Sequence, residues 1–161
     1  MVLIFRLNGI KYVRYHTTIA LKINIPKTAA IKNTIFTLTS QSKKITPDYD
    51  IIVRGLSPET PISALDTCQF NGDQVEFLSS QARWNEFQSL EEIEADVPMS
   101  ITLTNLVREF INHNAYVPGT FLHLVFSNGS PPKTSSSIPT LQFHTFHEDI
   151  NKRPKLWIEW S

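Results

Sequence analysis

The stretch ITLTNLVREFINHNAYVPGTFLHLVF, residues 101–126, decides the fold of this chain. Its first half repeats apolar side chains at the i, i+3, i+4, i+7 and i+8 spacing of one helix face, namely Leu103, Leu106, Val107, Phe110 and Ile111. A Pro-Gly turn follows, and the second half alternates as a strand does. We therefore predict one short helix at about 102–113, with Thr102 or Ser100 as its cap and Asn114 as its left-handed end.

The strand after this turn has two apolar faces. One face carries Leu122, Leu124 and Phe126, and the other carries Phe121, His123 and Val125. A strand that is apolar on both sides is typical of the centre of a sheet. The helix is therefore expected to lead into a central strand of the fold.

Most segments on either side of this unit show the period of two that is typical of half-buried strands. In residues 17–25 the apolar face consists of Ile19, Leu21, Ile23 and Ile25, opposite Ala20, Lys22 and Asn24. Further strands are predicted at about 31–41, 48–56, 141–146 and 155–160. Strands do not alternate with helices, which argues against a parallel α/β fold. We predict one domain over 1–161, an all-β, jelly-roll-type antiparallel β-sandwich with one short α-helix.

Three segments lack a strong pattern. Residues 57–98 are predicted to be a long irregular segment with weak strand signals at 74–78 and 81–87 and a turn at Asn71-Gly72. Loops of this length often carry function. Residues 128–139 are rich in Gly, Pro and Ser and are predicted to be a flexible loop, and residues 1–16 to be an edge strand or an interface arm.

The composition narrows the class of protein. Of the 161 residues, 41% are hydrophobic and 19% are charged, which fits a folded domain with a polar, largely uncharged surface. The single cysteine, Cys68, excludes an internal disulfide and fits a small structural residue. No apolar run is long enough to span a membrane, and residues 1–16 lack the pattern of a signal peptide. We expect a protein made in a host cytoplasm, with no membrane partner.

Charge is unevenly distributed along the chain. Eight basic residues and no acidic ones precede Asp48, whereas twelve acidic residues and three arginines lie between Asp48 and Glu109. Either strands of the two parts interleave and mix the charges, or the protein has a dipolar surface that docks onto another subunit or partner. The basic residues are scattered rather than clustered, so no nucleic-acid partner is expected.

The motifs of common enzymes and metal sites do not occur in this sequence. It has no phosphate-binding Gly loop, Cys-x-x-Cys, His-Glu-x-x-His or nucleophile elbow, so we expect no enzyme, no catalytic residues, no cofactor and no metal. His144 and His147 would point to opposite faces of a strand and converge only at a turn. The acidic run at 91–96 lacks the ligand spacing of a calcium loop and is predicted to be a solvated loop.

Three tryptophans are the candidates for a contact with a sugar or with a protein. Trp160 is predicted to share the core face of Leu156 and Ile158, whereas Trp157 lies on the opposite face, and Trp84 precedes a polar loop. An exposed aromatic side chain beside polar groups suits a sugar ring or a protein hot spot. Packing is the alternative for each tryptophan.

The order of these segments, over about 17–160, resembles the DNRLRE-type β-sandwich domains and related jelly-roll modules. The resemblance rests on a Pro-x-x-Ala-x-Ile turn (Pro26, Ala29, Ile31), a helix pattern before a Gly-led strand (Val107, Glu109, Phe110, Ile111, Gly119) and a closing Pro-x-Leu-x-Ile-x-Trp strand (Pro154, Leu156, Ile158, Trp160). The acidic and Arg-rich segment that gives the family its name is not recognisable. The resemblance implies an accessory β-sandwich, often carbohydrate-binding, in secreted or phage-borne proteins.

From these features we expect a non-enzymatic structural protein of a virion, such as a phage capsid decoration (cement) protein or an accessory head or tail protein. Its expected partners are other virion proteins and further copies of itself. The alternative is a carbohydrate-binding module whose partner is a glycan. A third option, a hydrolase or sugar lyase, needs converging carboxylate, Tyr or His groups, and no convincing set is found in the sequence.

Overall fold

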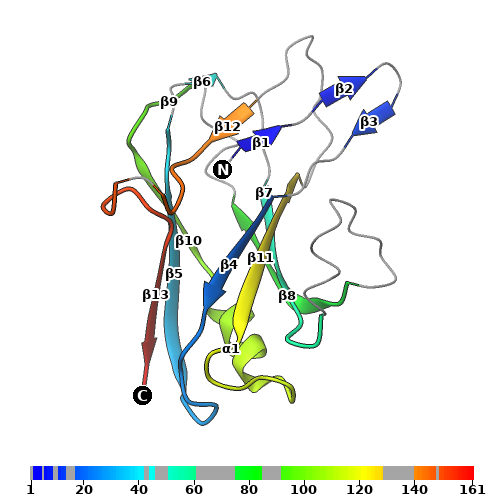
Figure 1. Ribbon diagram of the computed structural model, residues 1–161, viewed down its shortest axis with the longest axis vertical. Helices are drawn as coiled ribbons and strands as arrows, with labels where there is room; N and C mark the ends of the chain where they lie inside the picture. Colours follow the sequence, from blue (N-terminus) through cyan, green and yellow to red (C-terminus); the bar gives the residue numbers. More distant parts are fainter. Residues whose placement is uncertain are drawn as a thin grey trace.

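The computed structural model describes residues 2–4, 6–8, 11–13, 17–41, 44–45, 51–60, 75–84, 92–128, 140–147 and 149–161. In these ranges the chain forms thirteen strands and one helix (Figure 1). The elements are β1 (Val2–Ile4), β2 (Arg6–Asn8), β3 (Lys11–Val13), β4 (Thr17–Lys22), β5 (Ile31–Thr39), β6 (Lys44–Ile45), β7 (Ile51–Leu56), β8 (Phe77–Trp84), β9 (Glu92–Ile93), β10 (Pro98–Thr102), α1 (Thr104–Asn112), β11 (Phe121–Asn128), β12 (Thr140–Gln142) and β13 (Lys155–Trp160). Cys68, the Asn71-Gly72 turn and residues 129–139 lie outside the described residues.

Two antiparallel sheets form the body of the domain. One sheet has the order β4-β11-β7-β8, and the other has the order β10-β5-β13. Their strands run along the long axis of the view in Figure 1, with α1 at the lower end. The fold is therefore an all-β sandwich with one short helix. The jelly-roll connectivity, which needs eight strands, stays a prediction.

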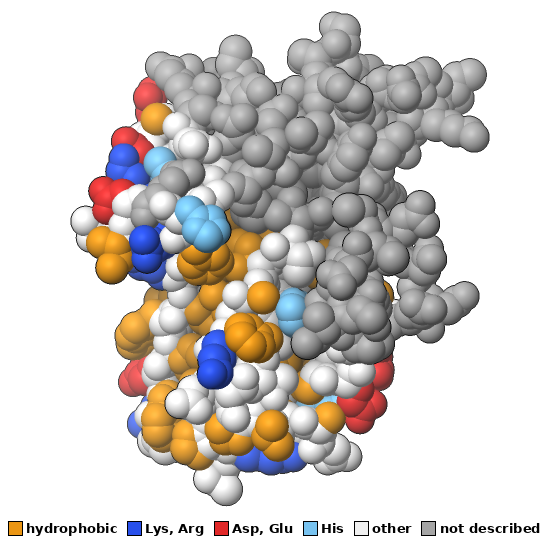
Figure 2. Space-filling view, viewed as in Figure 1, with side chains coloured by type: hydrophobic (Ala, Val, Ile, Leu, Met, Phe, Trp, Pro, Cys, Tyr) orange, Lys and Arg blue, Asp and Glu red, His pale blue; other side chains and the backbone are white. Residues whose placement is uncertain are grey.

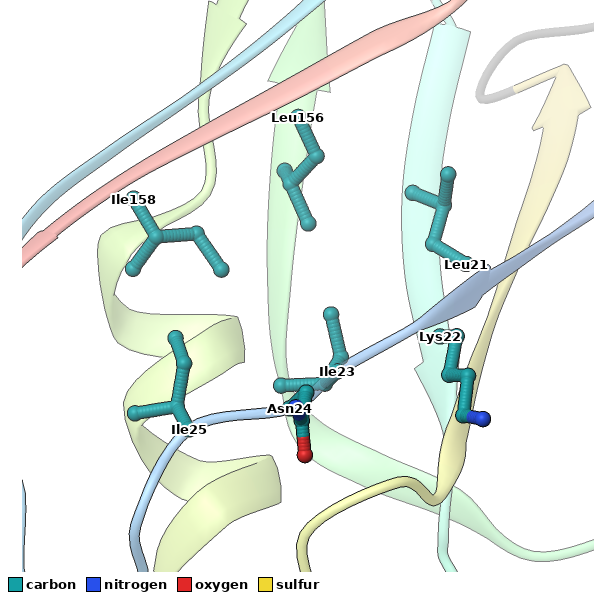
Figure 3. A pocket seen from close by; sticks show the side chains of 7 residues that line it. All are labelled: Leu21, Lys22, Ile23, Asn24, Ile25, Leu156 and Ile158. Carbon is teal, nitrogen blue, oxygen red and sulfur yellow. The ribbon is translucent and has the colours of Figure 1, made fainter.

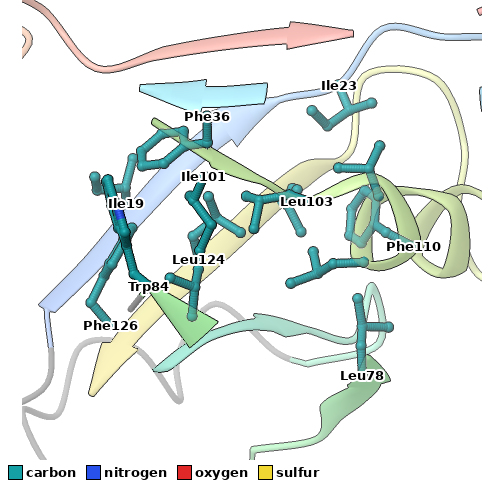
Figure 4. Close-up of a cluster of buried hydrophobic side chains, with 14 of the residues drawn as sticks. Ile19, Ile23, Phe36, Leu78, Trp84, Ile101, Leu103, Phe110, Leu124 and Phe126 are labelled. Carbon is teal, nitrogen blue, oxygen red and sulfur yellow. The ribbon is translucent and has the colours of Figure 1, made fainter. Parts of the chain in front are cut away.

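The central strands of both sheets follow the predicted alternation. In β11, Leu122, Leu124 and Phe126 are fully buried, and β11 lies between β4 and β7 as a central strand. In β5, Phe36 and Leu38 face the core, and the Phe36 ring lies 5.8 Å from the Phe126 ring across the sandwich. Figure 4 shows Phe36, Leu124 and Phe126 in one cluster with side chains of β8, β10 and α1, among them Trp84, Ile101 and Phe110. One apolar core therefore joins the sheets and the helix.

The helix is shorter than predicted, and its ends differ. Residues 98–102 belong to β10, so neither Ser100 nor Thr102 caps α1, and Leu103 takes the N-cap position without a side-chain cap. Thr102 is in an extended strand because β10 pairs with β5 there. At the other end His113 has an extended backbone, with φ −62° and ψ 143°, so Asn114 does not end the helix in a left-handed turn.

The segment 57–98 contains more regular structure than predicted. The two weak strand signals belong to one strand, β8, which pairs with β7 through residues Phe77 to Trp84. Glu92–Ile93 form β9, which pairs with β6. The sequence signal is weak because the outward positions of β8 carry small or polar side chains, among them Ser79, Gln81 and Arg83. Residues 61–74 and 85–91 lie outside the described ranges.

Two polar contacts fix the helix region to the sheets. The Glu109 carboxylate accepts hydrogen bonds from the N–H groups of Ser79 and Ser80, at 2.7 Å each, and from the Ser79 hydroxyl at 2.8 Å. Burial alone would raise the pKa of Glu109, but hydrogen bonding from the side chains and main-chain N–H groups of Ser80 and Ser79 lowers it to about 2. The buried Tyr116 hydroxyl donates to the carbonyl oxygen of Ile25 at 2.7 Å and accepts from its N–H at 3.3 Å.

Two strands of the basic N-terminal part, β4 and β5, pair with strands from the rest of the chain. β5 lies between β10 and β13, and β4 lies beside β11. This pairing agrees with the interpretation that strands of the basic and acidic parts interleave and mix their charges. The segment 1–16 contains β1, which pairs with β12, and the hairpin of β2 and β3. Among the described helices, none is long and apolar enough to cross a membrane.

Candidate binding surfaces

Ser57 and His113 form the nearest approach to a nucleophile and its base among the contacts of the described residues. The Ser57 hydroxyl lies 3.5 Å from Nε2 of His113, and the N–H of Ala115 donates to Nδ1 of the same ring at 3.3 Å. In a neutral imidazole one nitrogen accepts and the other carries the proton. Nε2 therefore presents its proton to Ser57 and cannot remove the proton of the hydroxyl. This pair is not arranged as a catalytic dyad.

The two histidines that were considered as metal ligands, His144 and His147, have different surroundings. His144 donates from Nε2 to the Asp96 carboxylate at 2.9 Å, and Lys152 donates to the same oxygen at 2.7 Å. These hydrogen bonds, first from Lys152 and then from His144, lower the pKa of Asp96. His147 is exposed, and Glu148 lies outside the described residues. Among the residues that the structure places, no group of three His, Cys, Asp or Glu side chains could hold a metal ion.

Asp96 itself is in the left-handed backbone region, with φ 63°. Its N–H donates to the carbonyl oxygen of Ser40 at 2.9 Å, and the Ser40 hydroxyl bonds to the carbonyl of Glu94 and to the N–H of Val97. Aspartate tolerates this conformation better than most residues. Glu94 and Asp96 are exposed, as predicted for the acidic loop. These hydrogen bonds account for the left-handed conformation of Asp96 without a bound ligand.

The three tryptophans have different surroundings. Trp84 is 2% exposed and belongs to the core, so it is not a surface candidate. Trp160 was predicted in the core but is 47% exposed; it is the last residue of β13 and lies beyond a shift in register against β5. Trp157 is 53% exposed on the outer side of the sheet, as predicted.

The outer side of the three-stranded sheet is the first candidate surface. We name it the Trp157 face, and it consists of Asn33, Ile35, Thr37, Ser100, Thr102, Lys155, Trp157 and Glu159. The register places Ile35 between Thr102 and Trp157 in one row, and Thr37 between Ser100 and Lys155 in the next. The Thr37 and Ser100 hydroxyls lie 2.8 Å apart and share a hydrogen bond. An exposed indole thus lies on the outer side of a sheet among hydroxyl, charged and aliphatic groups.

The outer side of the four-stranded sheet differs, because part of it is covered. Val125 is fully buried there with Leu56 and Val75, and Phe77 packs against them. The Arg54 guanidinium lies 4.1 Å from the centre of the Phe77 ring. Burial also lowers the pKa of His123, on the same strand as Val125. This side therefore offers less free surface near β7 and β8.

A groove between the two sheets is the second candidate surface. It has a volume of about 300 Å³ and lies between β4 and β13, lined by Leu21, Lys22, Ile23, Asn24, Ile25, Leu156 and Ile158. In Figure 3 the Leu156 and Ile158 side chains point from β13 toward those of the β4 strand and its extension. We name it the β4–β13 groove. Figure 2 shows hydrophobic side chains along the left and lower parts of the described surface.

A third depression lies at the opposite opening of the sandwich. It has a similar volume, about 300 Å³, and is lined by Gln81, Ala82, Thr102, Leu103, Thr104, Asn105 and Leu106. Four of its seven lining side chains are of polar residues, against two of seven in the β4–β13 groove. The sequence alone did not reveal either opening, because each combines side chains from segments far apart in the chain.

Comparisons with protein-family models, with curated proteins and with solved structures gave no match to this chain. The resemblance to DNRLRE-type domains therefore stays a prediction.

Proposed function

We propose that this protein is a non-enzymatic structural protein that acts through protein–protein contacts. The observation that carries the proposal is the position of Trp157, which is 53% exposed on the Trp157 face and has Lys155 and Glu159 on either side along β13. Tryptophan is enriched among the residues that dominate binding energy, and charged neighbours supply the polar rim of such contacts. The rigid sheet holds all three side chains in place without a loop.

The setting that we propose for these contacts is a virion, where the protein would decorate the capsid or join the head or tail. Support comes from the sequence, which has the size of a small domain and predicts a polar surface of few charges. The Trp157 face would meet another virion protein or a second copy. A reading frame next to a capsid or tail gene would strengthen this setting.

The proposal is tested by binding of the full chain to assembled shells of the virus that encodes it. We expect the wild-type protein to sediment with the shells and Trp157→Ala to lose affinity by at least about tenfold, the loss typical of a hot spot. Val117→Ala, which truncates another exposed apolar side chain, 63% exposed, is the matched control and should bind normally. Equal binding of Trp157→Ala and wild type would overturn the proposed surface, and no binding of wild type would overturn the setting.

A carbohydrate-binding module is the second candidate, and the same face favours it through a different feature. Thr102 lies in the same row as Trp157, beyond Ile35, and Thr37 and Ser100 lie in the next row. A sugar ring can stack on an indole while neighbouring hydroxyls bond to its own hydroxyl groups. Binding to a glycan array that is lost in Trp157→Ala and kept in Trp157→Phe would favour this candidate over the structural protein.

A further inference from the structure

The β4–β13 groove lies between two edge strands. Among the described residues, β4 pairs only with β11 and β13 pairs only with β5. Each strand thus has one side on which no described strand pairs with it, and both line the groove. Edge strands present main-chain donors and acceptors that favour the addition of another strand.

The hydrogen bonds show which groups of β4 face outward. The N–H of Ile23 donates to Thr120 at 3.0 Å, and its carbonyl oxygen accepts from Gly119 at 2.7 Å. Because these bonds alternate along an antiparallel strand, Ile19 and Leu21 also face β11. The main-chain groups of Thr18, Ala20 and Lys22 therefore point to the free side.

The side chains that line the groove are aliphatic except for those of Lys22 and Asn24. The aliphatic ones come from both sheets, and Leu21, Leu156 and Ile158 among them are only partly buried. Its volume of about 300 Å³ is roughly twice that of a ~150 Å³ cavity that binds benzene. Side chains that entered it would extend the core and remove exposed apolar surface from water.

The outward main-chain groups of β4 and the aliphatic lining of the groove together indicate which kind of molecule would bind there. A lipid chain could fill the groove but could not bond to the edge of β4. A second folded copy could pair edge to edge, but its own Ile19 and Ile23 are already buried in its own core. An extended peptide meets both requirements, because alternate side chains enter the groove while its main chain pairs with β4.

We propose that the β4–β13 groove binds an extended segment of a partner protein, which adds antiparallel to β4 and places every second, aliphatic side chain between the sheets. The remaining side chains lie on the outer side, next to Ala20 and Lys22. Because Lys22 is exposed there, an acidic residue opposite it is favoured. This inference rests on the proposed function, and it names the chemical form of the partner.

The test uses the full chain and the synthetic peptide acetyl-Thr-Val-Glu-Val-Thr-Val-Ser-amide with a fluorescent label. Fluorescence anisotropy gives its Kd. A peptide of the same composition without alternation should bind at least about tenfold more weakly, since it cannot bury its valines and pair its main chain together. No binding of the alternating peptide at about 1 mM, or equal binding of both peptides, would overturn the inference.

Methylation of the peptide nitrogens tests the pairing with β4. In the antiparallel arrangement the nitrogens of Glu and of the following Thr face β4, whereas those of the valines face away. Methylation of the Glu and Thr nitrogens should reduce the affinity of the peptide at least about tenfold. Methylation of two valine nitrogens should not reduce it. Equal affinities of the two methylated peptides would overturn the strand addition.

Two protein variants test the same site. Ala20→Pro removes an outward N–H, which an edge strand tolerates, and should weaken binding at least about tenfold. Lys22→Glu should prefer the peptide with Lys in place of Glu, by about threefold to tenfold. Lys155→Glu, on the Trp157 face, is the matched control and should show no such reversal. Failure of Lys22→Glu to reverse the preference would overturn the predicted register.

The outcomes also separate this inference from the proposed function. If shell binding depends on Trp157 and the peptide does not bind, the proposed function stands and the groove proposal fails. If the peptide binds and the shells do not, the groove proposal stands and the virion setting fails.

Discussion

The carboxylate of Glu109 in α1 accepts a hydrogen bond from the N–H of Ser80 in β8 at 2.7 Å. The neighbouring N–H of Ser79 donates to the other carboxylate oxygen at the same distance. One helix side chain therefore bonds to two consecutive main-chain amides of an edge strand.

We predict that Glu109→Gln destabilises the protein by roughly 1–2 kcal/mol at pH 7, a range reduced for the partial exposure of the carboxylate. The reason is that the amide group of Gln cannot accept from both N–H groups, since one end of it is a donor. Urea unfolding measures the loss. Glu76→Gln, on an exposed side chain close to β8, is the control, and an equal loss in both variants would contradict the prediction.

The same contact predicts a pH dependence. Folding lowers the pKa of Glu109 from 4.5 to about 2, so its stabilisation is fully present above about pH 4.5 and is lost as the pH falls toward about 2. Unfolding free energies measured between these pH values should converge for wild type and Glu109→Gln. A constant difference down to the lower value would contradict the assignment.

Tyr116→Phe should destabilise the protein by about 1–3 kcal/mol, because the N–H and carbonyl of Ile25 would lose their hydrogen-bond partner in a buried place. The amide of Ile25 should also exchange its hydrogen faster. Hydrogen exchange followed by NMR measures this rate. Val117→Ala, on an exposed neighbour, should leave it unchanged, and normal protection in Tyr116→Phe would disprove the role of the hydroxyl.

Gly55→Ala should cost about 1–3 kcal/mol, the usual range for an overpacked core. A Cβ at Gly55 would lie 2.9 Å from side-chain carbons of both Leu106 and Leu78. The cost should fall in the background of Leu106→Ala, which removes one of these contacts. A double-mutant cycle by urea unfolding measures the coupling, and additive effects would show that the crowding does not come from Leu106.

The tryptophans should differ in their contribution to stability. Trp84→Ala should destabilise by about 3–5 kcal/mol because it leaves a cavity in the core. Trp157→Ala should change the free energy of unfolding by no more than about 0.5 kcal/mol. Thermal unfolding compares the two, and the iodide quenching of each single-tryptophan variant reports exposure. Strong quenching of Trp84 would contradict its place in the core.

Much of the sandwich could be predicted because alternation reports burial directly. The pattern at Ile19, Leu21 and Ile23 predicted β4, and the two apolar faces of residues 121–126 predicted the central position of β11. The helix stripe predicted α1 because Leu106, Val107, Phe110 and Ile111 are all buried in the core. These signals are local, so a single sequence contains them.

Features set by tertiary contacts were harder to predict. Ser100 and Thr102 are good capping residues, yet pairing with β5 extends them into β10. Trp160 has the same spacing as Leu156 and Ile158 in sequence, but it is exposed at the end of β13, beyond a shift in register. The β4–β13 groove depends on where two edge strands lie in space, and neither strand contains that information alone. The candidate surfaces likewise combine residues of strands that are far apart in the sequence.

The arrangement of β5 between β10 and β13 has a consequence for the rate of folding. Thr37 pairs with Ser100 and Ile35 pairs with Trp157, so both partners of β5 lie far along the chain. Closing such long loops costs entropy before the pairing is gained, and domains with this topology fold in roughly milliseconds to seconds. Until β13 docks, one side of β5 is an open edge, and intermediates at that stage are the ones that we expect to aggregate.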